Sequence, residues 1–551
     1  MTLGPALRDA ALRWIADDPD PGTRLELQRV LAAAMTGDDG ATADLAERMA
    51  APLRFGTAGL RGPLRAGPNG MNVAVVRRAT AGLAAWLTGR GGGTVVVGRD
   101  ARHGSAAFAA AAAEVLAGAG LAVRTLPGPL PTPVLAFAVR ELGAAAGVQV
   151  TASHNPPTDN GYKVYLDDGA QLAPPADAEI EAAITAAAAA VSVPTGAGAT
   201  EVDVTEAYLE RVARLPRGRA RALRVALTPL HGVGGATCVH ALHRAGFTDV
   251  HVVGSQAAPD PDFPTVAFPN PEEPGVTDAL LALAAEVGAD LAVALDPDAD
   301  RCAVGVPLPG GSWRMLTGDE TGALLGDHLL RAGGFTDPLV ATTVVSSSML
   351  ASIAAGYGAR FAETLTGFKW IVRSGPGLVY GYEEALGYCV DPDAVRDKDG
   401  VAATVLACDL AAGLRAGGAN LLDRLDELAA AHGVHLTEGV SVRMEPGSRD
   451  AVVARLVAAP PPGWDASRPA PDVLVLRRAA EGSRGGERVV VRPSGTEPKL
   501  KAYLQVVEPP DPDVRRARAR AQRRLEALRA EVHSTVVGGE GGQDELPRTP
   551  P

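Results

Sequence analysis

The chain has 551 residues, a formal net charge of −12 and a pI near 5.4. Its length predicts roughly three or four domains, and 46% hydrophobic with 21% charged residues is typical of a globular protein. The acidic balance argues against nucleic acid as the main partner, although a local cluster of arginines can still bind an anionic small molecule.

Cysteine and lysine usage restrict the function further. The four cysteines are scattered and lack C-x-x-C spacing, which indicates reduced thiols. The sequence has no uninterrupted apolar run of about 20 residues, so we expect a cytoplasmic protein without membrane contact. Lysine is scarce, because 47 of the 52 basic residues are arginine. The pKa of a lysine can shift in a protein, whereas the planar guanidinium of arginine stays charged. Each lysine is therefore a candidate for a specific role. The five are Lys163, Lys369, Lys398, Lys499 and Lys501.

Short valine-rich runs alternate with alanine- and leucine-rich stretches along the chain. Residues 94–100 predict a strand and residues 104–120 the helix after it. The same order of apolar strand and polar loop recurs in 144–155, 222–235, 288–301 and 337–350. Such alternation predicts parallel strands covered by helices, with functional side chains just beyond the strand ends. The recurrence favours several similar α/β units.

Proline-rich segments near 187–203, 307–315 and 458–472 predict the seams between domains. The last segment precedes two predicted strands and a basic helix over 512–532. Acidic residues interrupt the arginines of this helix, which indicates a solvated face and not a nucleic-acid site. Residues 534–551 predict a disordered tail.

Asp296, Asp298 and Asp300 alternate in "ALDPDADR", directly after a predicted strand. Neighbouring carboxylates repel one another unless a cation relieves the repulsion, and oxygen ligands favour Mg²⁺ or Ca²⁺. An EF-hand is excluded, because Arg301 and Pro307 occupy the positions of its glycine and glutamate. The alternative is an acidic turn exposed to water.

The segment "VRPSGTEPKLKAY" combines cationic and hydroxyl side chains around a tight turn after a strand. Backbone N–H groups, hydroxyls and a guanidinium that converge in this way are typical of a phosphate site. The alternative is a polar hairpin turn. The candidate residues are Arg492, Ser494, Gly495, Thr496 and Lys499.

Two further segments carry candidate ligand-binding residues. Glu383 and Glu384 in "VYGYEEALGY" can accept hydrogen bonds from paired hydroxyls such as those of sugars, or can begin a helix whose dipole favours acidic residues. Lys369 lies a short distance before them in "TLTGFKWI". Arg61 lies between glycines in "RFGTAGLRG", where the backbone can approach a ligand closely.

Together these segments resemble the α-D-phosphohexomutases, the phosphoglucomutase/phosphomannomutase group. "TASHNPPTDNGYK" is similar to the phosphoserine loop of that family, and "DPDADR" to its metal loop. "GYEEALGY" is similar to its sugar-binding loop, "RPSGTEPKLK" to its phosphate-binding loop and "FGTAGLRG" to its N-terminal signature. The resemblance runs from about residue 50 to 510 in the order of the family.

The resemblance implies an α/β protein with four domains around a central cleft. Three would be related α/β units with mixed sheets, and the fourth a C-terminal α+β domain. We expect a helical N-terminal extension, domains I to IV and a tail, with the boundaries 1–50, 51–190, 204–308, 315–440, 441–533 and 534–551.

The resemblance also implies roles for the candidate residues. Ser153 would be phosphorylated, and Mg²⁺ would bridge its phosphate to the three aspartates. Lys163 would be a general acid or base with a pKa lowered by neighbouring cations. Arg61 and Arg301 would stabilise charge, whereas His154 would either orient phosphate or only pack. The other substrate-binding residues implied are Lys369, Glu383, Glu384, Arg492, Ser494, Gly495, Thr496 and Lys499.

The implied reaction moves a phosphate between the 1- and 6-positions of a hexose through a sugar bisphosphate, such as glucose 1,6-bisphosphate. Many hexomutases carry Ser-Gly-His at the end of the sugar loop, where this chain has Leu386, Gly387 and Tyr388. This form resembles the phosphoglucomutase-2-type branch, some members of which act on pentose phosphates. A phosphopentomutase and a non-catalytic sugar-phosphate sensor are therefore the alternatives. The expected partner is a small phosphosugar, with the protein a monomer or homodimer.

Overall fold

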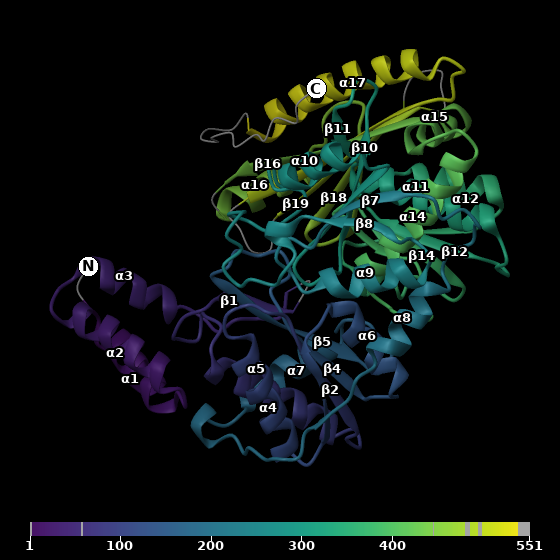
Figure 1. The fold of residues 1–551 in the computed structure, drawn as a ribbon. Helices are drawn as coiled ribbons and strands as arrows, with labels where there is room; N and C mark the ends of the chain where they lie inside the picture. The colour runs from purple at the N-terminus through teal and green to yellow at the C-terminus, as the bar shows by residue number, and fades with distance from the viewer. Residues whose placement is uncertain (1–2, 57–58, 445, 480–484, 494–498, 538–551) are drawn as a thin grey trace. The chain divides into compact units, whose positions relative to one another are not determined.

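The computed structural model describes residues 3–56, 59–444, 446–479, 485–493 and 499–537 (Figure 1). The chain forms two compact units. Unit 1 comprises Met1–Arg314 and Gly387–Asp409, and unit 2 comprises Met315–Leu386 and Leu410–Pro551. The chain therefore returns to unit 1 for one segment, Gly387–Asp409, which lies inside the stretch that the sequence assigned to domain III.

Three helices open unit 1: α1 (Pro5–Asp17), α2 (Pro21–Met35) and α3 (Asp39–Arg48). Asp20 and Asp38 each accept a hydrogen bond from the first turn of the following helix, which fixes where α2 and α3 begin. Their apolar faces share one core, in which Trp14, Leu27 and Leu45 are buried.

The first sheet of unit 1 has the strand order β1-β5-β4-β2-β3-β6 and is mixed. Its central strands are parallel, whereas β5 is antiparallel to β4 and β1 is antiparallel to β5. Helices cover both faces, so the central strands are buried apolar runs. The strands are β1 (Leu60–Pro63), β2 (Thr94–Arg99), β3 (Ala122–Pro129), β4 (Ala146–Val150), β5 (Asp159–Leu166) and β6 (Thr200–Glu201), and the helices are α4 (Val73–Thr88), α5 (Ser105–Gly118), α6 (Thr132–Glu141) and α7 (Ala176–Ala186).

The second sheet of unit 1 repeats this plan. Strands β8, β7 and β9 are parallel, and β10 returns antiparallel to β9. In each sheet, a buried parallel strand ends in a loop that leads directly into an antiparallel strand: β4 into β5, and β9 into β10. The elements are β7 (Arg224–Thr228), β8 (Asp249–Val252), β9 (Leu291–Leu295), β10 (Cys302–Pro307), α8 (Thr205–Ala213), α9 (Gly234–Arg244) and α10 (Asp278–Val287).

Unit 2 contains a parallel sheet and an antiparallel sheet. The parallel strands are β12 (Leu339–Thr343), β13 (Arg360–Thr364) and β14 (Leu378–Glu383), with helices α11 (Gly318–Ala332), α12 (Met349–Tyr357), α13 (Phe368–Ile371) and α15 (Leu421–His432). The antiparallel strands are β16 (Val434–Arg443), β17 (Asp465–Ala470), β18 (Val473–Ala479), β19 (Gly486–Pro493) and β20 (Lys499–Glu508), with helices α16 (Pro446–Ala458) and α17 (Val514–Val537). Three α/β sheets followed by a C-terminal antiparallel sheet confirm the predicted fold class.

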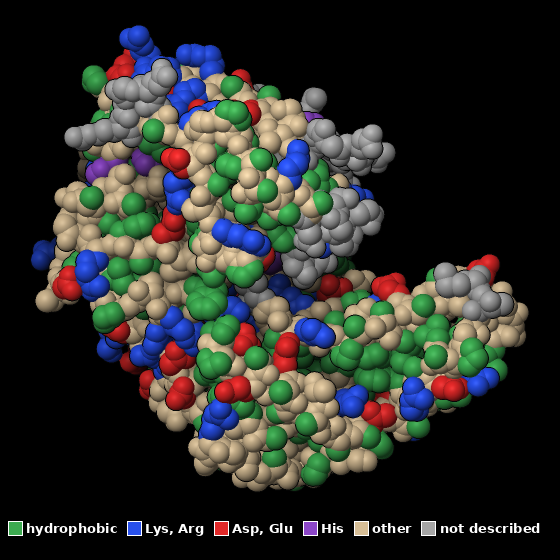
Figure 2. All heavy atoms as spheres, turned by 180° about the vertical axis from the view of Figure 1, so that it is seen from behind, with side chains coloured by type: hydrophobic (Ala, Val, Ile, Leu, Met, Phe, Trp, Pro, Cys, Tyr) green, Lys and Arg blue, Asp and Glu red, His purple; other side chains and the backbone are tan. Residues whose placement is uncertain are grey.

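Helix α17 is the basic C-terminal helix that the sequence predicted over 512–532. It continues to Val537, so the first residues of the predicted tail are helical, and residues 538–551 lie outside the described residues. Its arginines form ion pairs, as Arg520 does with Glu508 at 2.9 Å and Arg524 with Glu487 at 3.1 Å. These pairs favour a solvated surface over a nucleic-acid site. Figure 2 shows the face opposite to that of Figure 1, on which acidic and basic side chains are interspersed.

Helix length and composition bear on membrane contact. In the described part of the chain, no single helix is long and apolar enough to span a membrane. Helices α14 (Gly400–Ala416) and α15 reach the required length and composition only as a sharply bent pair. The described residues of α14 are buried up to Ala412, as expected for a core helix.

Candidate active site

The loop between β4 and β5 places Ser153 just beyond the end of a buried parallel strand. Ser153 has a φ of 53°, a left-handed conformation that residues other than glycine rarely adopt. Its backbone N–H donates to the Thr151 hydroxyl at 2.9 Å. The serine is 2% exposed. Strained backbone that a well-packed surrounding maintains is a feature of functional sites.

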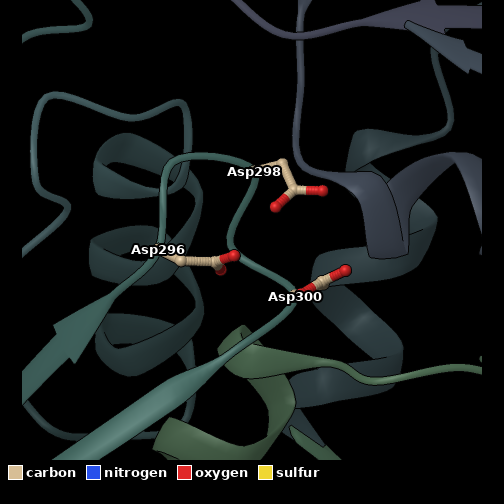
Figure 3. A group of neighbouring side chains, drawn as sticks. All are labelled: Asp296, Asp298 and Asp300. Atoms are coloured by element: carbon tan, nitrogen blue, oxygen red, sulfur yellow. The ribbon is translucent and has the colours of Figure 1, made fainter. Parts of the chain in front are cut away.

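The loop between β9 and β10 carries Asp296, Asp298 and Asp300, which we call the acidic triad. All three aspartates are buried, and one carboxylate oxygen from each lies within 4.8 Å of the others. Figure 3 shows the three carboxylates on one turn of the chain, around a shared space. Ala299 in this turn has a φ of 55° and its N–H donates to the Asp296 carbonyl at 2.8 Å. The turn therefore folds the alternating aspartates to one side.

The serine loop and the acidic triad meet. The Ser153 hydroxyl donates to Asp296 Oδ2 at 2.8 Å. Lys163, on strand β5, donates from Nζ to Asp298 Oδ2 at 2.6 Å and to Asp300 Oδ2 at 2.9 Å. Segments more than a hundred residues apart in the chain thus bring together a hydroxyl, three carboxylates and an ammonium.

The triad fits a hard divalent cation. Asp298 Oδ1 and Asp300 Oδ1 are buried without a hydrogen-bond partner, whereas the Oδ2 atom of each carboxylate is bound by Lys163. Burial, followed by the two neighbouring carboxylates, raises the pKa of Asp296 well above its usual range. A cation would satisfy the unpartnered oxygens and offset the repulsion, and oxygen ligands suit Mg²⁺. The residues that would hold it are the triad and Ser153.

We expect Mg²⁺ to raise the thermal midpoint of the protein, since a ligand that binds only the folded state stabilises it. Asp298→Asn removes one ligand charge and should weaken Mg²⁺ binding by at least ~10-fold, as a titration of the thermal midpoint against Mg²⁺ would measure. Asp278→Asn, at an exposed position on α10, is the matched control. Equal Mg²⁺ affinities for the two variants would contradict a cation site at the triad.

Lys163 differs from the sequence-based expectation in one respect. Its side chain is 1% exposed, and burial lowers its pKa, but Asp298 and Asp300 together outweigh burial and raise the pKa from its ordinary value. The expected lowering of the pKa is therefore wrong for this structure. The reason is that the sequence suggested neighbouring cations, whereas the closest groups are two carboxylates.

Two predicted arginines also lie at this site. Arg61, on β1, is paired with Gly161 of β5 and donates to Asn155 Oδ1 at 3.4 Å. Burial lowers the pKa of Arg61, against the attraction of the triad. Arg301 ends the acidic loop, and its Nη1 donates to Glu272 at 3.2 Å. The arrangement places fixed positive charge around the serine hydroxyl.

His154 packs and also contacts the serine. Its Nδ1 lies 3.2 Å from the Ser153 hydroxyl oxygen, and its ring makes an edge contact with Phe268 at 6.2 Å between centroids. Burial, followed by the charges of Arg301 and Arg61, holds the pKa of His154 well below 6.5. The imidazole is therefore neutral at pH 7.

Two further residues contact the triad, and sequence analysis assigned neither of them to this site. Thr132, at the start of α6, donates to Asp298 Oδ2 at 2.6 Å. Lys398, in the segment that returns to unit 1, places its Nζ 3.4 Å from Asp300 Oδ2 and 3.3 Å from Asp397 Oδ1. The scarcity of lysine in the sequence indicated that Lys398 could have a specific role. Nothing in the sequence distinguishes Thr132 from the other threonines.

In unit 2, two further predicted segments meet at one turn. Glu383, at the end of β14, accepts a hydrogen bond from the Gly367 N–H at 2.7 Å. Arg492, on β19, donates to the Thr366 hydroxyl. Lys369 lies in the same region, on α13. The predicted sugar-binding and phosphate-binding segments thus approach each other.

The remaining predicted residues are also in unit 2. Glu384 accepts a hydrogen bond from the Ser346 hydroxyl at 3.0 Å. Lys499 begins strand β20 and is paired with Arg443. Ser494, Gly495 and Thr496 lie outside the described residues.

Comparison with known protein families gives three successive matches. Residues 52–190, 206–308 and 317–432 match the models of alpha/beta/alpha domains I, II and III of phosphoglucomutase/phosphomannomutase. Together the three models cover more than half of the chain, in their natural order.

Individual relatives extend over most of the chain. A Haemophilus influenzae protein named "Probable phosphomannomutase" is 40% identical over 81% of this chain and 95% of its own length. A human protein named "Phosphopentomutase" is 31% identical over 90% of this chain and 91% of its own length. Among solved structures, a Burkholderia thailandensis protein of the phosphoglucomutase/phosphomannomutase family has a TM-score of 0.69 at 20% identity, over 88% of this chain and 98% of that one.

Proposed function

The chain belongs to the α-D-phosphohexomutase superfamily and is a sugar-phosphate mutase, and from this premise we propose that it exchanges a phosphate between the 1- and 6-positions of a hexose. One observation carries the proposal: the Ser153 hydroxyl lies 2.8 Å from a carboxylate of the buried triad. The 40% identity with the Haemophilus influenzae relative supports a hexose as substrate.

Ser153 is the proposed phosphoryl carrier. In the first half of the reaction, the bond between phosphorus and the Ser153 oxygen breaks, a new bond forms to the free hydroxyl oxygen of the sugar monophosphate, and the proton of that hydroxyl passes to the Ser153 oxygen. In the second half, the bond between the other phosphorus and its sugar oxygen breaks, that phosphoryl group bonds to the Ser153 oxygen, and the serine proton passes to the sugar oxygen. Mg²⁺, held by the triad, would neutralise charge on the transferring group. Arg61 and Arg301 are proposed to stabilise the same charge from fixed positions.

Further residues are proposed for the rest of the substrate. Glu383 and Glu384 present carboxylates that can accept hydrogen bonds from sugar hydroxyls. Cationic and hydroxyl side chains can bind the phosphate that is not reacting. They are Lys369, Arg492, Ser494, Thr496 and Lys499, with the backbone of Gly495. Glucose 1,6-bisphosphate is the proposed activator, because it can phosphorylate an unmodified Ser153.

A phosphopentomutase is the second candidate. The human relative of that name covers 90% of this chain. In addition, Leu386, Gly387 and Tyr388 replace the Ser-Gly-His of many hexomutases, and Tyr388 is fully buried. A pentose phosphate has one CHOH unit fewer than a hexose phosphate and therefore one hydroxyl fewer to bind. The altered sugar loop is the place where a preference for pentoses would arise.

A coupled assay tests the proposed function directly. Glucose 1-phosphate, mannose 1-phosphate and ribose 1-phosphate are compared with catalytic glucose 1,6-bisphosphate present. We expect kcat/KM for the better hexose to exceed that for ribose by at least ~10-fold. The reverse ratio would support a phosphopentomutase, and binding without turnover would support a sensor. Release of inorganic phosphate as the only product would instead indicate a phosphatase.

A further inference from the structure

One buried guanidinium binds the backbone of the serine loop at several points. Arg102, which follows strand β2, donates to the carbonyl oxygens of Ser153 and Asn155 at 2.6 Å each, and to that of Pro156 at 2.7 Å. The Arg102 side chain is 1% exposed. A guanidinium carries its donors in a rigid planar fork, so these bonds fix the carbonyls relative to one another.

Arg102 is itself held from two sides. Asp100 Oδ2 lies 3.3 Å from its Nε atom, and Asp100 Oδ1 accepts a hydrogen bond from the Ser105 hydroxyl at 2.5 Å. On the other side, the guanidinium carbon lies 4.9 Å from the ring centroid of Phe263. Phe263 is 2% exposed and lies in the segment between strands β8 and β9 of the second sheet of unit 1. The position of Arg102 therefore depends on both sheets of that unit.

We propose that Arg102 is a positioning residue for phosphoryl transfer, because its bonds to the loop carbonyls hold Ser153 in the left-handed conformation that directs the hydroxyl toward Asp296. A serine with a φ of 53° relaxes to a more common conformation unless its surroundings prevent it. Relaxation would move the hydroxyl away from the triad. The effect on the chemical step rests on the proposed function, whereas the conformation of the loop does not.

The test compares two arginines that both donate to backbone carbonyls and lie over a phenylalanine ring, although Arg221 is the more exposed of the two. Arg221 also donates to backbone carbonyls, those of Ala245 at 2.6 Å and Ala220 at 2.7 Å, and lies over Phe247 at 5.1 Å, but it is not bonded to the serine loop. Lysine keeps the charge and loses the planar fork. Arg102→Lys and Arg221→Lys are therefore compared with the wild type in the full chain. Amide hydrogen exchange of residues 151–160 and the thermal midpoint need no substrate.

The second readout is the rate at which glucose 1,6-bisphosphate phosphorylates Ser153, followed by intact-mass spectrometry. We expect Arg102→Lys to speed exchange in 151–160 by ~10-fold or more and to slow phosphorylation by about 100-fold. KM should change by no more than about 3-fold, because the substrate is not contacted. Arg221→Lys should leave exchange in the loop and phosphorylation at wild-type values even if its thermal midpoint falls.

Equal loop exchange in the two variants would overturn the proposal, whether or not the enzyme turns over. Faster exchange with a wild-type rate of phosphorylation would overturn it as well. If Ser153 of the wild type takes up no phosphate from glucose 1,6-bisphosphate, the proposed function fails. The rate of amide hydrogen exchange then decides by itself whether Arg102 holds the loop. Should Arg102→Lys not fold, Phe263→Leu keeps the guanidinium and removes the ring beside it. Unchanged exchange in that variant would likewise overturn the proposal.

Discussion

Ser153→Ala is expected to reduce mutase turnover by ~10⁴-fold or more, because it removes the oxygen atom that is proposed to carry the phosphoryl group. The substitution removes one buried oxygen and leaves the backbone N–H bond to Thr151 in place. The fold should therefore survive. The loss is measured as kcat in the coupled assay, and as the absence of phosphate uptake from glucose 1,6-bisphosphate by intact-mass spectrometry.

Two further variants distinguish the effect of losing the hydroxyl from the effect of backbone strain at position 153. Ser153→Gly also lacks the oxygen, but glycine adopts a φ of 53° without strain, so it should be more stable than Ser153→Ala by about 1 kcal/mol. If Ser153→Gly has the higher thermal midpoint but is as inactive as Ser153→Ala, the loss of activity comes from the missing oxygen and not from backbone strain. Ser192→Ala, at an exposed serine of the same unit, is the control. Near-normal turnover in Ser153→Ala would exclude Ser153 as the carrier.

The sequence was most informative about the loops that follow buried parallel strands, because both the strand and the loop have a recognisable residue pattern. A parallel strand buried on both faces must be apolar, so β4 and β9 are visible as valine-, alanine- and leucine-rich runs, and the polar residues after them mark the loops. That reasoning located Ser153 and the acidic triad. It could not show that the two loops belong to different sheets and meet.

Long-range contacts set the limits of sequence analysis. Thr132 reaches Asp298 from 166 residues away, and Lys398 lies near Asp300 only because one later segment of the chain returns to unit 1. The pKa of Lys163 was predicted in the wrong direction for the same reason. The sign of a pKa shift depends on which charges lie within a few ångströms, and the closest carboxylates come from more than 130 residues further along the chain.

Lys163→Arg is expected to lower kcat by at least ~100-fold although it keeps the positive charge. Lys163 Nζ lies 2.6 Å and 2.9 Å from oxygens of two triad carboxylates, in a fully buried position. A guanidinium is larger, planar and unable to occupy the same point between the two oxygens. It must push Asp298 and Asp300 apart, which overpacks the site and displaces the oxygens that face the shared space. Mg²⁺ affinity should fall together with kcat.

The thermal midpoint of Lys163→Arg is measured beside kcat, so that a general loss of stability is distinguished from a defect at the site. If the scarcity of lysine only reflected composition, the substitution would be neutral. A compact ammonium is required at position 163 because it bonds two carboxylates through Oδ2 and leaves the Oδ1 atoms of both without a partner. Lys163→Met separates charge from size: it removes the ammonium that competes with a cation for the triad carboxylates, without overpacking, so Mg²⁺ affinity should rise in this variant whereas it falls in Lys163→Arg. Wild-type kcat and Mg²⁺ affinity in Lys163→Arg would contradict this account, because an arginine would then serve as well as the lysine.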